Sequence, residues 1–491
     1  MSVEHSRAIK LAEQVSTSKG ARLERHLEAS DVVVSVDPEL AYGQLTTHVL
    51  LTTLRRGPGN LTLIANGLRP AYINELEAAA AAIDSDRPLR VVRRGESWPE
   101  RAIAVHVGPT SPHPAIRIVP EGHGAHVASA PSAVIRPQRA PSPLGAVYTA
   151  ALGAAEIFKH SARVISRRRV LQRHLTFCPV ALSRDLAAAP DLYARMTLDI
   201  SLIGIGAIGT GIVLLLDALG AEGRLVAVDR QRYARENLGT YSLGGIVEVA
   251  SQPWKVDVAR RALPRFDVVT VADSVNNLLR SIDAGDARWT PTVLTALDSP
   301  EARREAQRLW PDRLIDAATG DTMLGLHDHR YGMDPCLWCV FPVNRQAPSG
   351  ADAIAARLGL DVAILADADA VLTDDHLEGK SEEQLKLLRP LVGTSMCGLA
   401  HAAELSSLEA DGYMPSVPFV SLQAACLSVG RLIAAYAGSS PPVNLVQYDG
   451  LFGPQAATLE LMRRRPDCIC IERHSTIERI RAMRRELDGG R

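Results

Sequence analysis

The chain has 491 residues, of which 54 are basic and 55 acidic, so the net charge is close to zero and nothing argues for nucleic acid or another polyanionic partner. Its length allows two or three domains, and 46% hydrophobic but only 4% aromatic residues indicate a helix-rich α/β protein. There is no run of 18 apolar residues and no signal-peptide pattern at the N-terminus, so we expect a cytoplasmic protein without a membrane partner and with reduced cysteines.

Residues 1–190 are predicted to form an N-terminal α/β domain. Short strand-like runs occur at 31–37, 61–66 and 89–94, with helical stretches between them. Near the end of this part, residues 142–165 form one long apolar segment with the composition of a buried helix. No internal repeat is apparent in the sequence.

Residues 199–229 (DISLIGIGAIGTGIVLLLDALGAEGRLVAVD) read as strand, glycine turn, helix and strand. Gly204 and Gly206 permit a tight turn and close approach of a phosphate, and Gly209 lets the helix pack against the strand. Asp229 follows the second strand, 20 residues after Gly209, where a carboxylate can bind ribose hydroxyls. This combination predicts a nucleotide site in a Rossmann-like fold; the alternative is a turn that only joins strand to helix.

Three segments downstream carry further polar residues at strand and helix ends: ARENLGTYSL, SQPWKVDVARRAL and VLTALDSPEARR. Together with the glycine turn they resemble the ThiF, MoeB and ubiquitin-activating enzyme family. The resemblance implies that Asp229 and Asn237 hold the ribose and a nearby phosphate of ATP, Lys255 the phosphates and Asp298 a Mg²⁺ ion. The chemistry agrees, because a lysine neutralises phosphate and a strand-end carboxylate is a hard ligand. Any one of these residues alone would be read as a surface charge.

Two positions depart from the family pattern. Ala207 stands where a second glycine is usual, which still allows a helix to start. Thr240 stands where the family has an arginine that contacts the transferred phosphates. Arg232, Arg235 or an arginine from the first half of the chain would have to replace that cation.

Four of the seven cysteines occur as two close pairs. Cys336 and Cys339 form a CxxC, and Cys468 and Cys470 form a CxC about 130 residues later. Four thiolates suit tetrahedral Zn²⁺, and the resemblance implies a structural zinc site at these places. The alternatives are four reduced thiols packed in a core or a redox-active CxxC.

Cys397 is the candidate nucleophile. It lies between glycines and just before a long apolar segment, at the place where the resembled enzymes carry a cysteine that accepts an activated carboxyl group. The alternative is a structural thiol. Residues 344–392, rich in alanine, leucine and acids, are predicted to form a helical insert before Cys397. The acidic face of this insert either meets a basic partner or is simply solvated.

The resemblance implies a ThiF-like adenylation domain at residues 191–475, closed by zinc-bound strands and followed by a charged tail at 476–491. The enzyme would adenylate the C-terminal glycine tail of a ubiquitin-like protein with MgATP and then form a thioester on Cys397. A conjugating enzyme is a possible further partner. Residues 1–190 would be either a degenerate adenylation half, giving a pseudo-dimer within one chain, or an unrelated α/β domain; a homodimer is the other arrangement.

Three other functions remain open. A MoeB-like sulfur-carrier adenylyltransferase would need no covalent cysteine step. A nicotinamide or flavin enzyme shares the glycine turn but has little use for Lys255, Asp298 and the paired cysteines. A non-catalytic scaffold of the same fold is favoured by Thr240.

Overall fold

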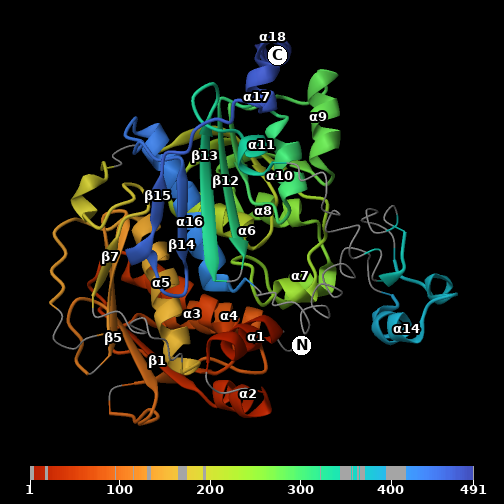
Figure 1. Cartoon of the computed structure of the whole chain (residues 1–491). Helices are drawn as coiled ribbons and strands as arrows, with labels where there is room; N and C mark the ends of the chain where they lie inside the picture. Colours follow the sequence, from red (N-terminus) through yellow and green to blue (C-terminus); the bar gives the residue numbers. More distant parts are fainter. Residues whose placement is uncertain are drawn as a thin grey trace. The chain divides into compact units, whose positions relative to one another are not determined.

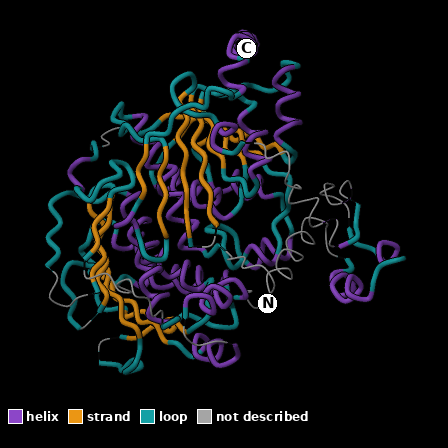
Figure 2. Tube along the Cα trace, in the orientation of Figure 1, coloured by secondary structure: helices purple, strands orange, loops and turns teal. Residues whose placement is uncertain are grey.

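Two sheets, each built mainly of parallel strands, organise most of the chain (Figures 1 and 2). The chain divides into a larger unit, Met1–Phe341 with Pro415–Arg491, which holds both sheets, and a smaller unit, Pro342–Met414. The computed structural model describes residues 5–16, 20–93, 95–113, 115–129, 134–163, 174–191, 195–320, 322–342, 355, 358–361, 364, 371–393 and 416–489.

The first sheet contains seven strands: β1 (Asp31–Val36), β2 (Asn60–Ile64), β3 (Arg90–Val92), β4 (Ile103–Val107), β5 (Ile116–Glu121), β6 (Gly124–Ala128) and β7 (Leu175–Phe177). Their order is β3-β2-β1-β4-β5-β6-β7. The strands from β3 to β5 run parallel, and β6 and β7 are antiparallel. The valine-rich β1 is almost wholly buried, as expected for the central strand of a parallel sheet covered on both faces.

The second sheet contains eight strands: β8 (Thr197–Ile203), β9 (Glu222–Val228), β10 (Phe266–Val271), β11 (Thr292–Thr295), β12 (Arg313–Gly320), β13 (Met323–Arg330), β14 (Leu445–Asp449) and β15 (Thr458–Glu460). Their order is β10-β9-β8-β11-β12-β13-β14-β15, with β10 to β12 parallel and the last three antiparallel. Ile203 pairs with both Val228 and Thr295, so β8, β9 and β11 end at one edge. The predicted α/β class with a Rossmann-like second half is confirmed.

The two sheets repeat one topology. Counted from β1 and from β8, the first seven strands have the same order, 3-2-1-4-5-6-7, with the same directions. Each half also places a 19-residue apolar helix between its sixth and seventh strands: α5 (Pro143–Ser161) and α16 (Pro418–Tyr436). Both begin with proline, which suits the first helical position because its missing N–H has no partner there.

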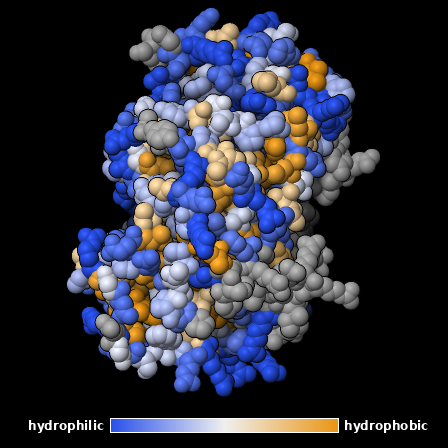
Figure 3. All heavy atoms as spheres, turned by 90° about the vertical axis from the view of Figure 1, so that its left-hand side faces the viewer, coloured by the Kyte–Doolittle hydropathy of each residue, from blue (hydrophilic) through white to orange (hydrophobic). Residues whose placement is uncertain are grey.

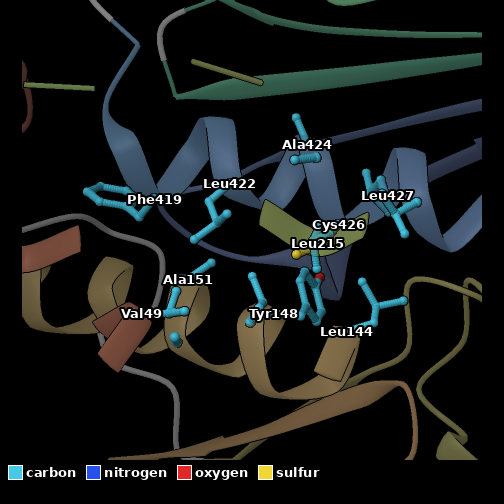
Figure 4. Close-up of a cluster of buried hydrophobic side chains, with 14 of the residues drawn as sticks. Val49, Leu144, Tyr148, Ala151, Leu215, Phe419, Leu422, Ala424, Cys426 and Leu427 are labelled. Carbon is cyan, nitrogen blue, oxygen red and sulfur yellow. The ribbon is translucent and has the colours of Figure 1, made fainter. Parts of the chain in front are cut away.

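Helices of the two halves pack against each other between the sheets. α3 (Gly43–Arg55) and α5 lie on the first sheet, α16 lies on β12 and β13 of the second sheet and contacts α6 (Ala207–Ala218), and α5 contacts α16. Figure 4 shows Phe419, Leu422 and Cys426 of α16 facing α5. The rings of Phe158 and Phe419 lie 5.4 Å apart, and the hydroxyls of Tyr148 and Tyr448 are 3.1 Å apart. The main core is therefore shared by both halves.

The remaining helices cover the outer faces or connect strands. In the larger unit they are α1 (Ser6–Val15), α2 (Gly20–Glu28), α4 (Pro70–Ile83), η1 (Leu186–Ala188), η2 (Arg235–Asn237), α7 (Ile246–Ser251), α8 (Lys255–Ala262), α9 (Val275–Asp283), α10 (Pro300–Gln307), α11 (Leu337–Val340), η5 (Pro454–Ala456), α17 (Ile469–Glu472) and α18 (His474–Gly489). The described part of the smaller unit contains η3 (Asp374–Leu377), α14 (Glu382–Leu388) and η4 (Arg389–Leu391) around a small leucine-rich core.

One described helix, α16, is long and apolar enough to cross a membrane, but most of it is buried inside the protein. Its apolar character is explained by its contacts with α5, α6 and the second sheet. On the surface shown in Figure 3, apolar residues lie in small groups separated by polar ones. The long apolar segment is therefore a core helix here.

Candidate functional site

The turn between β8 and α6 contains three glycines, Gly204, Gly206 and Gly209, and each has a different structural role. Gly204 has φ +92°, and a Cβ there would lie 2.6 Å from the carbonyl oxygen of Ala296. A Cβ on Gly209 would lie 2.1 Å from the carbonyl oxygen of Gly204. Both positions therefore require glycine for the fold itself, as the sequence predicted for Gly209.

Gly206 is different, because among the described residues the space beside it is open. Its φ of −83° suits any residue, and apart from its chain neighbours the only described atom near a Cβ at this position is the hydroxyl oxygen of Tyr241, at 3.9 Å. α6 begins directly after Gly206, with Ala207 as its first residue. The free N–H groups of a helix start attract anions, so this open space is where a phosphate would approach the backbone.

Asp229 follows β9 and closes the turn from the other side. One carboxylate oxygen accepts a hydrogen bond from the backbone N–H of Ile205 at 2.7 Å, and the other accepts from that of Gln231 at 2.8 Å. Each oxygen keeps a further acceptor position. Asp229 therefore holds the glycine turn in place and can still accept a hydroxyl.

Lys255 is the first residue of α8, and it is buried beside Asp229. Its Nζ donates to Oε1 of Gln231 at 2.5 Å and lies 5.1 Å from the centre of the Tyr241 ring. Burial alone would lower the pKa of Lys255, but the hydrogen bond with the Tyr241 hydroxyl and the carboxylate of Asp229 outweigh it and raise that pKa. The ammonium group stays charged at neutral pH, as a phosphate-binding lysine must.

Asn237 ends η2, and its side chain is used locally. Its Oδ1 accepts the backbone N–H of Ala234 at 2.8 Å, and the residue is only 6% exposed. Thr240 is buried, and its hydroxyl has no hydrogen-bond partner among the described residues. The loop that contains Asn237 and Thr240 therefore contributes an amide side chain and a fixed backbone, but Thr240 supplies no positive charge.

The arginines proposed as substitutes are engaged elsewhere or exposed. Arg232 stacks on the Trp254 ring at 4.0 Å and donates to the carbonyl of Gln252. Arg235 is exposed. From the first half, buried Arg56 donates to the carbonyl of Leu238 at 2.6 Å and to that of Gly244 at 3.2 Å. The first half therefore fixes the backbone of the loop.

Asp298 is exposed in the loop between β11 and α10, at the sheet edge that also carries Gly204 and Asp229. The preceding residue, Leu297, packs on the glycine turn, and its carbonyl accepts two hydrogen bonds from Arg303, at 2.9 and 2.8 Å. This loop geometry places an unburied carboxylate near the turn, as a Mg²⁺ ligand would need.

Arg303 and Asp316 were not anticipated from the sequence. Arg303 Nε lies 3.9 Å from fully buried Asp316, which accepts the hydroxyl of Thr295 at 2.6 Å. Burial raises the pKa of Asp316, although Arg303 and Thr295 oppose this. An acid inside the apolar run LIDAAT could have marked Asp316 as a buried polar residue. Its contact with Thr295, however, depends on the pairing of β11 with β12.

The four paired cysteines come together, although they are about 130 residues apart in the chain. Cys336 directly precedes α11 and Cys339 lies within it, and likewise Cys468 directly precedes α17 and Cys470 lies within it. All four are buried, and their sulfur atoms lie within 4.8 Å of one another. Three sulfur pairs are 3.5, 3.6 and 3.9 Å apart.

Those spacings fit a tetrahedral zinc site. With Zn–S bonds of about 2.3 Å, tetrahedral geometry separates the sulfurs by roughly 3.8 Å. Trp310, Tyr331 and Ile477 surround the cluster and exclude water. Within the described part of the chain, this is the one group of three or more metal-ligating side chains at this spacing. The predicted four-cysteine cluster is present, with a geometry compatible with Zn²⁺, and the shorter CxC spacing does not prevent it.

Cys397 lies outside the described residues. Much of the predicted insert at 344–392 also lies outside them. The structure therefore brings together the glycine turn, Asp229, Asn237, Lys255 and Asp298 at one edge of the second sheet, and assembles the cysteine cluster separately.

Comparisons with known proteins give only weak likenesses. No family model matches the chain, and no curated protein matches it. Among solved structures, E. coli MccB matches 55% of this chain and 64% of its own length at 16% identity, with a TM-score of 0.35. The structure of E. coli MccB with AMPCPP and selenomethionine MccA matches 56% of this chain and 66% of its own length at 14% identity, with a TM-score of 0.36. The structure of E. coli MccB with ATP matches 66% of this chain and 85% of its own length at 13% identity, with a TM-score of 0.37.

Proposed function

We propose that the protein is an ATP-dependent adenylyltransferase that activates a carboxyl group. The observation that carries this proposal is the open space at Gly206, at a helix start, beside a buried and charged Lys255. Asp229 is placed to accept ribose hydroxyls, and exposed Asp298 is suited to a Mg²⁺ ion. A dehydrogenase would have little use for the lysine and the second acid.

In the proposed reaction, a substrate carboxylate oxygen attacks the α-phosphorus of ATP, the bond to the β-phosphate oxygen breaks, and pyrophosphate leaves. Lys255 offsets the charge that develops on the phosphates, and the glycine turn keeps attacker and phosphorus in line. The substrate class we infer is the C-terminal glycine tail of a ubiquitin-like protein, followed by transfer of the acyl group to Cys397 with loss of AMP. This finer step rests on the sequence resemblance.

The test is exchange of pyrophosphate into ATP, with the candidate ubiquitin-like protein as substrate. We expect exchange by the wild type and a loss of about 100-fold or more in Lys255→Ala and Asp298→Ala, because each removes charge stabilisation from the transition state. Asp267→Ala, an exposed carboxylate on β10 of the same sheet, is the matched control and should keep full exchange.

A non-reducing gel then separates the alternatives. A thiol-sensitive adduct that Cys397→Ala abolishes supports the covalent step. Exchange without an adduct supports the MoeB-like reaction, and no exchange with any tested tail supports a scaffold.

We infer that the first half is a degenerate adenylation half. It has the strand order of the second half, but the residues that follow its strands β1 and β2 differ from those that follow β8 and β9. The turn after β1 is longer and carries two acids, Asp37 and Glu39, before α3, which disfavours phosphate. β2 is followed by Ala65 and Asn66 in place of a carboxylate.

Such a chain should bind one nucleotide, in the second half. Isothermal titration with MgATP is expected to give one site per chain, and Lys255→Ala should remove it. Asp37→Ala should leave the stoichiometry at one. Two sites in the wild type, or one that survives in Lys255→Ala but not in Asp37→Ala, would show that the first half binds nucleotide.

A further inference from the structure

The hydroxyl of Tyr241 lies over the glycine turn. In the part of the chain that the structure describes, and apart from chain neighbours and the backbone of α6, it is the only atom within 4 Å of a Cβ placed on Gly206. The Tyr241 side chain is 7% exposed, and its ring meets the Tyr233 ring edge-on at 5.7 Å. The hydroxyl therefore borders the open space that the proposed function assigns to phosphate.

The backbone around Tyr241 is fixed on both sides. Its N–H donates to the carbonyl of Asn237 at 3.0 Å, and the N–H of Ser242 donates to the hydroxyl of Thr210 in α6 at 3.1 Å. Arg56 of the first half holds the same loop through the carbonyls of Leu238 and Gly244. The position of the hydroxyl is thus set before any nucleotide binds, which lowers the ordering cost of a contact.

The phenol is suited to donate a hydrogen bond there. Burial raises the pKa of Tyr241, while Lys255 lowers it, and the net effect is a rise. The hydroxyl therefore keeps its proton at neutral pH, and a neutral donor can sit in a buried site where a second unpaired cation would be costly.

Building on the proposed function, we propose that Tyr241 donates a hydrogen bond to the polyphosphate of bound ATP and, together with Lys255, takes the place of the cation missing at Thr240. Tyr241 and Lys255 then form one phosphate-binding pair, because the Lys255 ammonium lies 5.1 Å from the Tyr241 ring centre. Tyr241 follows Thr240 directly in the chain, so the same loop supplies both the missing position and its replacement.

The test compares Tyr241→Phe with Tyr233→Phe. The first change keeps the ring packed against Tyr233 and removes the hydroxyl, which lies over the turn and also hydrogen-bonds Lys255. The second removes a buried hydroxyl that donates to the carbonyl of Leu243 at 3.2 Å and interacts with Arg56, so it reports any effect that comes only from loosening the loop. Binding of ATP and of adenosine is measured by competition against a fluorescent ATP analogue, with thermal unfolding as a check of the fold.

We expect Tyr241→Phe to weaken ATP binding about tenfold or more, the scale of a hydrogen bond to a charged acceptor, and to leave adenosine binding unchanged. Tyr233→Phe should bind both as the wild type does. Equal loss of ATP and adenosine, or unchanged ATP binding, would overturn the role of Tyr241. A wild type that binds no ATP would instead overturn the proposed function.

Discussion

Removal of zinc, or the change Cys468→Ser, is expected to cause the largest loss of stability of any change considered. The four sulfurs join α11, which follows β13, to α17, which precedes the C-terminal helix α18. A ligand bound only by the folded state contributes about 4 kcal/mol when it is present at 1,000 times its dissociation constant. With an unfolding entropy of about 2.1 cal/mol/K per residue, we expect the unfolding midpoint to fall by roughly 4 °C.

Zinc content is measured by elemental analysis, and unfolding by calorimetry with and without a chelator. One Zn²⁺ per chain and a chelator-sensitive midpoint are expected for the wild type, with both lost in Cys468→Ser. Cys426→Ala is the control, because Cys426 is buried in α16 away from the cluster. It should lower stability through lost packing but keep zinc and the chelator response. Wild-type protein without zinc, or Cys468→Ser as stable as wild type, would falsify the metal site.

Gly206→Ala is expected to weaken nucleotide binding and pyrophosphate exchange strongly while leaving the fold intact. Among the described residues outside the turn itself, the added methyl group meets no atom closer than the Tyr241 hydroxyl at 3.9 Å, and the φ of −83° accepts alanine. In the complex, the same methyl group would occupy the space that the phosphate needs. Displacing the phosphate by even about 1 Å should reduce pyrophosphate exchange by roughly 100-fold.

Gly209→Ala is the contrasting variant on the same turn. Its methyl group would lie 2.1 Å from the carbonyl oxygen of Gly204, so the turn itself must shift and the protein should unfold at lower temperature. Circular dichroism, thermal unfolding and ATP titration distinguish the two outcomes. If Gly206→Ala binds ATP normally, phosphate does not approach the backbone at this turn.

Local sequence patterns predicted those parts of the site whose residues lie close together in the chain. The glycines, the apolar strand before them and Asp229 specify the turn between β8 and α6, and the cysteine spacing predicts the cluster. Arg303 and Asp316 escaped prediction because their meeting depends on the register of β11 with β12. The loop that carries Tyr241 is bonded by Arg56, which is almost 190 residues earlier than Gly244.

No internal repeat is apparent in the residues themselves, and only the family resemblance offered a degenerate first half as one of two alternatives. Strand order follows from which strands pair, and pairing is decided by long-range packing, which different side chains can satisfy equally well. The two 19-residue helices show this. α5 and α16 occupy the same place in the two halves, yet their sequences share little beyond an initial proline and an apolar, alanine-rich character.

The continuity of the chain through both halves has a thermodynamic consequence. When two subunits associate, mass action makes their contact weaker on dilution. Here α5 and α16 belong to one molecule, so their encounter is governed by an effective concentration fixed by the connecting segment. The loop that Arg56 holds, and the turn that it borders, therefore stay assembled in a single molecule at any dilution.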